Sequence, residues 1–458
     1  MKLLQSLNDS FLIKALNGFF ESTQKASSAL IENGFLIKNI DNLINIFAFA
    51  TLFFSTFLDS EKLGITMIAA FGFLTLKYLL KAGSKITIDI FDLLVVVYVL
   101  IFCVAAFTSS WFLDSLHGLI KTITYFFSYL VFKDSIKTKP TYRVLYIALI
   151  AFLSSSEAFI GIYQQLFKVD SLATWQDLSN MNPEQIMTRV FGTLQPLNPN
   201  LLAGYLIATM PAILGCTFYD FKKKQFNIIA AIGLLTTLLT IVFTGCRGAY
   251  IAITAQMATF IAISGHIIWH DFSEKQYLRK IWSGTILFGI TSVLLLILSQ
   301  EALRTRVCSI FAQREDSSTA FRMNVYQSSF KMFLDNFFCG IGVGNWTFRE
   351  VYGLYMRTGF DALGAYCVPL EIAVETGILG LINFIGFIGT SIFLAIKKIG
   401  EKIPYNEKII MSVTLISLIG MMIHGMVDTV WFRPQIQFVF WLIIAILSQT
   451  NTLTNEVK

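Results

Sequence analysis

Long apolar stretches separated by short polar segments run along most of the 458-residue chain. A bilayer core takes roughly 20 apolar residues per helix, so each such stretch predicts a membrane-spanning helix. The expected spans lie near 43–58, 63–80, 91–108, 116–132, 144–166, 201–219, 226–244, 249–268, 281–299, 366–394, 409–427 and 436–449. The pattern predicts an all-α, polytopic membrane helix bundle of about 12 transmembrane helices, with a large outer loop between the ninth and tenth.

Lysine and arginine alternate between rich and poor loops, which predicts the orientation of the bundle. The rich loops include residues 133–143, 222–224, 275–280 and 397–408. Cytoplasmic loops of membrane proteins carry this excess. We therefore expect a cytoplasmic N-terminal tail over 1–42, a transmembrane domain over 43–449 with a periplasmic loop over 300–365, and a cytoplasmic C-terminal tail over 450–458. The first tail lacks the pattern of a cleaved signal and has room for an amphipathic helix on the membrane.

Composition supports the membrane class and excludes several others. Hydrophobic residues make up 55% of the chain and charged residues 14%, whereas a soluble domain is nearer a quarter charged. The net charge of +6 is assigned to cytoplasmic loops, so we expect membrane lipid and no nucleic acid as a partner. None of the six cysteines forms a CxxC pair, so no metal and no cofactor is expected. Cys308 and Cys339 share the large loop, where a disulfide is chemically open; the oligomeric state is open as well.

Two arginines are candidate anion-binding residues. Arg247 lies at the outer junction of two spans between Cys246 and Gly248, and Arg322 lies in an expected amphipathic helix of the large loop. A guanidinium at membrane depth is costly without a partner, and its fork suits a phosphate or diphosphate. Snorkelling to lipid head groups is the alternative for Arg247, and solvation the alternative for Arg322.

Several acidic and histidine residues are candidates for lining a path through the helix bundle or for catalysis. Glu157 lies inside the fifth expected span, with Lys121 and His117 of the preceding span as its candidate partners. An intramembrane carboxylate is a functional hypothesis by default, with structural pairing as the alternative.

Two pairs of residues lie one helical turn apart. They are Glu371 with Glu375 and His424 with Asp428. Residues at this spacing share a helix face, so each pair either serves a substrate or stiffens a helix end. For Asp428 we expect a structural bond with Arg433.

Two short motifs predict turns. Asn198-Pro199-Asn200 precedes an expected span, so Asn200 is interpreted as its cap, with ligand binding as the alternative. Gly340, Gly342 and Gly344 precede Asn345 in a run that predicts a tight turn rather than a dinucleotide site, because no strand–helix unit surrounds it.

Four features together resemble a known family. They are the Thr244-Gly-Cys-Arg-Gly-Ala-Tyr250 motif, the large loop between the ninth and tenth spans, Phe321-Arg322 followed by Asp335-Asn-x-x-x-Gly340-Ile-Gly-Val-Gly-Asn, and the closing Glu375-Thr-Gly-Ile-Leu-Gly380. The chain resembles the O-antigen ligase and polymerase superfamily of bacterial membrane proteins, most strongly over 198–434. Within it, three stretches look most like the cyanobacterial branch assigned to inorganic-carbon (bicarbonate) transport. They are Leu197-Asn-Pro-Asn-Leu-Leu-Ala-Gly-Tyr205, Leu363-Gly-Ala-Tyr366-Cys-Val-Pro-Leu-Glu371-Ile-Ala-Val-Glu375 and His424-Gly-Met-Val-Asp-Thr-Val-Trp-Phe-Arg-Pro434.

The resemblance implies two functions from different classes. The first is a metal-independent glycosyltransferase or ligase of cell-envelope polysaccharide, in the bacterial cytoplasmic membrane, with an undecaprenyl-diphosphate-linked donor held by Arg247 and Arg322. The family's catalytic histidine position is occupied here by Tyr366, whose ordinary pKa near 10 makes it a poor base. Glu371, Glu375 or His424 would then replace it, with Asn200 and His424 also candidates for substrate binding. The second function is bicarbonate transport, or assistance to it, along Glu157, Lys121 and His117.

Overall fold

The structure is a computed structural model, and it describes residues 7–31, 34–169, 189–219, 227–299, 301, 304 and 318–449. This part of the chain is helical and has no strand. Its helices are α2 (Phe11–Ile31), α3 (Phe35–Lys38), α4 (Ile40–Phe54), α5 (Ser60–Leu80), α6 (Ile90–Thr108), α7 (Phe112–Thr138), α8 (Thr141–Leu166), α9 (Pro199–Phe218), α10 (Ile228–Phe243), α11 (Arg247–His270), α12 (Gln276–Ser299), α14 (Ser318–Asp335), α15 (Asn345–Tyr352), α16 (Val368–Gly400), α17 (Tyr405–Gly425), η3 (Val430–Phe432) and α18 (Pro434–Ser448). Cys308, one partner of the disulfide considered above, lies outside the described residues, and among the described cysteines none is bonded to Cys339.

The helices confirm the prediction of a polytopic membrane bundle. Seven described helices, α5, α6, α8, α9, α11, α16 and α17, are long and apolar enough to cross a membrane, and α4, α10 and α18 are shorter apolar helices. The two remaining expected spans, 116–132 and 281–299, fall within α7 and α12. Each apolar stretch of the sequence is thus helical, as expected for backbone that satisfies its hydrogen bonds within one segment.

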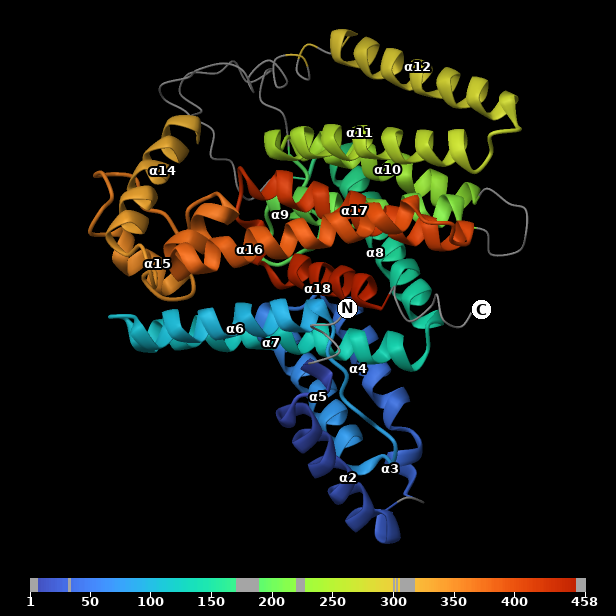
Figure 1. The fold of residues 1–458 in the computed structure, drawn as a ribbon. Coiled ribbons are helices and arrows are strands. Elements are labelled where there is room, and N and C mark those ends of the chain that lie inside the picture. Colours follow the sequence, from blue (N-terminus) through green and yellow to red (C-terminus); the bar gives the residue numbers. More distant parts are fainter. Residues whose placement is uncertain are drawn as a thin grey trace.

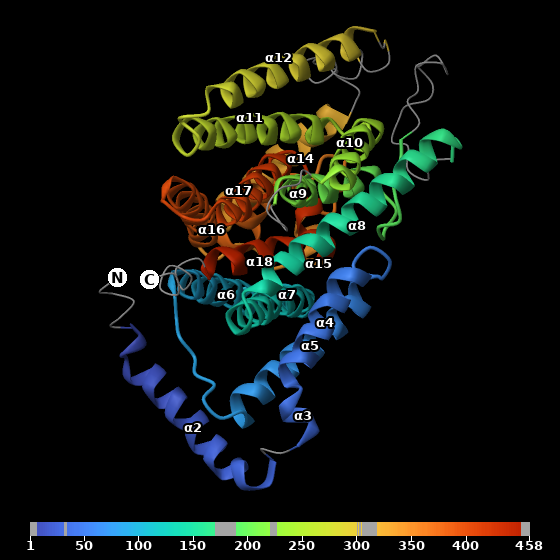
Figure 2. The same cartoon turned by 90° about the vertical axis from the view of Figure 1, so that its right-hand side faces the viewer.

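The centre of the bundle is formed by α9, α17 and α18. Helix α9 packs against α8, α10 and α17, and α18 packs against α7. Every residue of α18 is buried, which is the environment expected for a helix that is apolar on all sides. Helix α12 lies outside α11 at one edge, and α2 lies at the opposite edge in both views (Figure 1, Figure 2).

Amide side chains fasten the N-terminal residues to the extended segment between α5 and α6. The Asn8 amide donates to the carbonyl of Ile88 at 2.9 Å and accepts from its N–H at 2.8 Å. The Asn17 amide repeats this two-point contact with Ile86, at 3.1 and 2.9 Å. Each side chain therefore bonds to the main chain of this segment as a neighbouring strand would.

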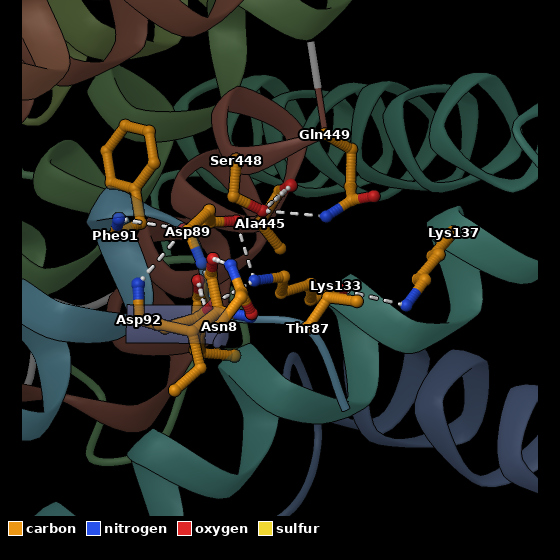
Figure 3. A network of polar contacts seen from close by, with 12 residues as sticks. Asn8, Thr87, Asp89, Phe91, Asp92, Lys133, Lys137, Ala445, Ser448 and Gln449 are labelled. Atoms are coloured by element: carbon orange, nitrogen blue, oxygen red, sulfur yellow. Dashed lines mark hydrogen bonds and ion pairs between the residues drawn. The ribbon is translucent and has the colours of Figure 1, made fainter. Parts of the chain in front are cut away.

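A buried charge cluster joins α6 and α7 (Figure 3). The ammonium of Lys133 lies 2.6 Å from Asp89 and also bonds Asp92, whose other oxygen accepts from the Tyr129 hydroxyl at 2.9 Å. Asp89 is in addition the N-cap of α6, accepting from the N–H groups of Phe91 and Asp92. Only 11% of the Lys133 side chain is exposed, so its two carboxylate partners provide the compensation that a buried charge requires.

The glycine run forms a turn that packs directly on α16. Gly340, Gly342 and Gly344 adopt positive φ values of 72°, 108° and 99°. The N–H of Ile341 donates to the carbonyl of Val374 at 2.9 Å, and that of Gly342 donates to the carbonyl of Glu375 at 3.1 Å. Helix α16 breaks nearby at Gly377, where φ is 69°. The turn therefore fixes the end of α16 that lies closest to α14 and α15, which sit together at one side of the bundle (Figure 1).

Candidate functional site

Arg322 projects from α14 toward the turn that follows α17. Its Nη2 lies 3.6 Å from Oδ2 of Asp428, and its guanidinium lies over the ring of Tyr366, 5.9 Å from the centroid. The Arg322 side chain is 24% exposed and that of Asp428 only 6%. The site therefore pairs a buried carboxylate with a cation that reaches solvent.

Asp428 gathers donors from three segments of the chain. Its carboxylate accepts from the amide of Asn200 at 3.1 Å and from the N–H of Val430 at 3.2 Å, besides facing Arg322. The expected bond with Arg433 is wrong: among the ion pairs of the described residues, Asp428 pairs with Arg322. Asp428 bonds to Asn200 and Arg322, which are distant in the sequence, because the tertiary fold brings α9 and α14 to this carboxylate.

Asn200 bridges Asp428 to a further arginine, and its interpretation as a helix cap is wrong. The N-cap of α9 is Asn198, whose Oδ1 accepts from the N–H of Asn200 at 2.7 Å. The Asn200 side chain instead accepts from Nη2 of Arg189 at 2.5 Å. Arg189 also donates from Nε to the carbonyl of Thr244 at 2.6 Å. Arg189 and Asn200 thus connect Asp428 to the end of α10.

The segment that carries Arg247 packs against the same turn. Arg247 is half-buried and begins α11 directly after Cys246, whose Sγ lies 3.6 Å from Nε2 of His424. Gly248 permits this contact, because a Cβ there would lie 2.7 Å from a methyl of Val427. His424 is buried in the last turn of α17, whereas Asp428 follows the end of that helix, so the expectation that the two share a helix face is wrong. The structure therefore brings Arg322, Asn200 and the neighbours of Arg247 onto one stretch of chain, residues 424–428, which contains His424.

Tyr366 lies beneath Arg322 in a constrained backbone conformation. Its φ is 52°, and its carbonyl accepts from the Tyr326 hydroxyl at 3.2 Å. Burial raises the pKa of the Tyr366 hydroxyl, and the carboxylates of Asp428 and Glu371 raise it further, against the opposing effect of Arg322. The phenol is therefore neutral at physiological pH and better suited to donate a hydrogen bond than to accept a proton.

Glu371 and Glu375 hold the backbone that leads into α16. Glu371 is 1% exposed and accepts from the N–H of Ala365 at 2.9 Å, next to Tyr366. Glu375 is 3% exposed and accepts from the N–H of Gly344 at 2.9 Å. Lys121 of α7 lies within electrostatic range of both carboxylates. This arrangement places Glu371 beside the Arg322 site and Glu375 beneath the glycine turn.

Glu157 and Lys121, two residues of the expected intramembrane path, have different partners. Glu157 of α8 bonds both the N–H of Thr193, at 2.9 Å, and the Thr193 hydroxyl. Lys121 is within electrostatic range of Glu371 and Glu375, and His117 is exposed on the same helix, α7. Glu157 and Lys121 therefore interact with different groups.

Sequence reasoning missed one residue of the Arg322 site, Arg189, and it selected Asp428 but not the partners, Arg322 and Asn200, that the structure gives it. One signal for Arg189 was its position among the few basic residues of the lysine-poor loops. In the described part of the chain, no group of three or more His, Cys, Asp or Glu residues is placed to hold a metal ion.

Comparison with protein families finds a match over part of the chain. The family model described as O-antigen ligase matches residues 232–385. This range contains Arg247, Arg322, Tyr366, Glu371 and Glu375, and it ends before His424. No curated protein gives a significant match. The family match supports an O-antigen-ligase-like domain in a multi-pass membrane protein.

Proposed function

We propose that this protein binds a lipid-linked diphosphate glycan at the outer leaflet of the membrane and transfers the glycan to an acceptor. The observation that supports this most strongly is the meeting of Arg322 and Asn200 on the Asp428 carboxylate, beside His424. His424 in turn contacts the cysteine next to Arg247. Guanidinium and amide donors at one partly buried place suit the several oxygens of a diphosphate.

In this proposal the arginines stabilise the leaving group. Arg322 is 3.6 Å from Asp428, longer than a charge-assisted hydrogen bond, so a phosphate oxygen can draw the guanidinium away from the carboxylate. Asn200 and Arg247 would supply further donors to the same diphosphate. Such donors act on the charge that develops as the bond to the leaving oxygen breaks.

The proposed reaction is a direct displacement. The acceptor hydroxyl oxygen attacks the anomeric carbon of the donor sugar, the bond from that carbon to the diphosphate oxygen breaks, and the lipid diphosphate leaves with the electron pair. Glu371 is the proposed base for the hydroxyl proton, because it lies next to Tyr366 in the site. The neutral Tyr366 hydroxyl would donate a hydrogen bond to a reacting oxygen, and Glu375 would hold the glycine turn in place.

Reconstituted protein, a lipid-diphosphate glycan and an acceptor polysaccharide test this proposal. Arg247→Ala and Arg322→Ala should each lower the transfer rate by about 10²–10³, the effect of removing one donor to a developing anion. Arg349→Ala is the matched control, because its pair with Asp361 is on the same segment but 45% and 57% exposed. Full transfer by both site variants would refute the proposed donor site.

Inorganic-carbon transport, the other function that the sequence left open, has no specific observation in its favour. Its candidate residues Glu157 and Lys121 interact with different groups. Uptake of labelled bicarbonate into proteoliposomes holding this protein alone, under a sodium or proton gradient, would reverse the choice between the two functions.

A further inference from the structure

A stripe of exposed apolar side chains runs along α14. Met323, Phe330 and Leu334 are 51%, 52% and 52% exposed. They lie seven and four residues apart, which places them on one face of the helix. The opposite face is buried through Val325 and Met332. The stripe is thus part of the face that α14 leaves uncovered, which also carries the exposed polar side chains of Gln327 and Lys331.

The stripe borders a groove between α14 and the start of α16. Tyr326, Gln327 and Phe330 line it from α14, and Cys367 and Leu370 line it from the other side. The groove has a volume of about 370 Å³ and a wall that is almost entirely apolar. An exposed apolar patch of this kind marks a place where hydrocarbon or an apolar partner binds.

The groove is continuous with the Arg322 site. Tyr326, which lines it, donates from its hydroxyl to the carbonyl of Tyr366. The ring of Tyr366 lies under the guanidinium of Arg322. A cationic site therefore opens directly onto an apolar track, which extends about 16 Å from Met323 to Leu334 at 1.5 Å per helical residue.

We propose that this groove and stripe bind the polyisoprenoid chain of the lipid-linked donor while Arg322 binds its diphosphate. The inference rests on the proposed function and adds where the lipid lies. The ligand that fits is an amphiphile with a doubly charged head and a long hydrocarbon chain, because both chemistries meet at Tyr366. Covering the stripe with hydrocarbon removes exposed apolar surface from water, which favours binding. Bulk membrane lipid lacks the diphosphate that Arg322 would select.

Photocrosslinking of the full-length protein in nanodiscs tests the location directly. The probe is a polyprenyl diphosphate with a photoreactive group in its chain. We expect crosslinks on α14 between residues 323 and 334 and on residues 367–370, with loss of labelling when unlabelled undecaprenyl diphosphate competes. A photoreactive phospholipid serves as the comparison probe. Equal labelling of the stripe by the phospholipid, unaffected by undecaprenyl diphosphate, would identify it as bulk-lipid contact and overturn the proposal.

Kinetics provide a second, independent test. Phe330→Ser and Leu334→Ser should raise KM about tenfold for a donor with a full-length chain and leave it unchanged for a donor with two isoprene units. Leu354→Ser is the control, since Leu354 is 80% exposed and does not line the groove. An unchanged KM for both donors would overturn the chain track while leaving the diphosphate site intact. Loss of transfer in Arg322→Ala alone reports on that site, so the two failures are distinguishable.

Discussion

Gly340→Ala should separate the glycine turn from α16. A Cβ at this position would lie 2.3 Å from the carbonyl carbon and oxygen of Glu375 and 2.5 Å from the nitrogen of Thr376. All three are backbone atoms, so no side-chain rotation relieves the clash. The φ of 72° adds about 1–2 kcal/mol for a residue with a Cβ, and overpacking adds about 1–3 kcal/mol, giving about 2–5 kcal/mol in total.

Gly359→Ala is the matched control for this variant. Gly359 has a similar φ of 88°, but nothing lies within 4 Å of the position of its Cβ. Its substitution should therefore cost the conformational component alone, about 1–2 kcal/mol. Equilibrium unfolding in mixed micelles measures both free energies. The difference, about 1–3 kcal/mol, corresponds to an about 5- to 150-fold change in the unfolding equilibrium constant. Equal destabilisation by the two variants would refute the reasoning that close backbone approach requires Gly340.

Three further variants probe other parts of the structure. Asn198→Ala should destabilise the start of α9 by about 1 kcal/mol in the same unfolding assay and leave donor binding unchanged, whereas Asn200→Ala should keep the cap and weaken donor binding; an equal loss of donor binding in the two variants would contradict this division. Lys133→Met leaves Asp89 and Asp92 without their cation and should lower the free energy of unfolding by about 3–5 kcal/mol. Adding Asp92→Asn to this variant should recover part of that loss. If the losses of the two single variants simply add in the double variant, the two residues are not coupled. The raised pKa of Tyr366 contributes stability that is present below pH about 10 and is lost as pH rises through the folded-state pKa, so Tyr366→Phe should flatten the stability profile between about pH 9 and 11; parallel profiles would contradict the shift.

The helices were predictable because spanning a membrane is a property of one continuous stretch of sequence. The apolar run expected over 366–394 lies within α16, yet its break at Gly377 was not foreseen. That break depends on the turn at Gly340, whose Cβ position nearly touches the backbone of Glu375. The hydrophobic pattern of one segment does not reveal which other segment will pack against it, so it cannot predict a break that such a contact causes.

The candidate site was predictable in its parts and not in its connections. Arg322 and Asn200 were both selected from the sequence, but their shared partner Asp428 is 228 residues from Asn200. Asn198 and Asn200 are equally suited to cap α9, and the choice is decided by Asp428 and Arg189, which engage the second asparagine. Local sequence preference therefore predicted correctly that the Asn198-Pro199-Asn200 motif caps α9, but it selected Asn200 instead of Asn198 as the capping residue.

The side-chain amides of Asn8 and Asn17 determine which sequence changes the segment between α5 and α6 can accept. They bond to the N–H and carbonyl of Ile88 and Ile86, groups that every residue except proline carries. Substitution at either isoleucine therefore keeps these contacts, while loss or gain of a single residue between the two attachment points turns one amide toward the wrong face of the extended chain. Homologous chains that keep both asparagines are thus free to vary the side chains of this segment but are bound to conserve its length.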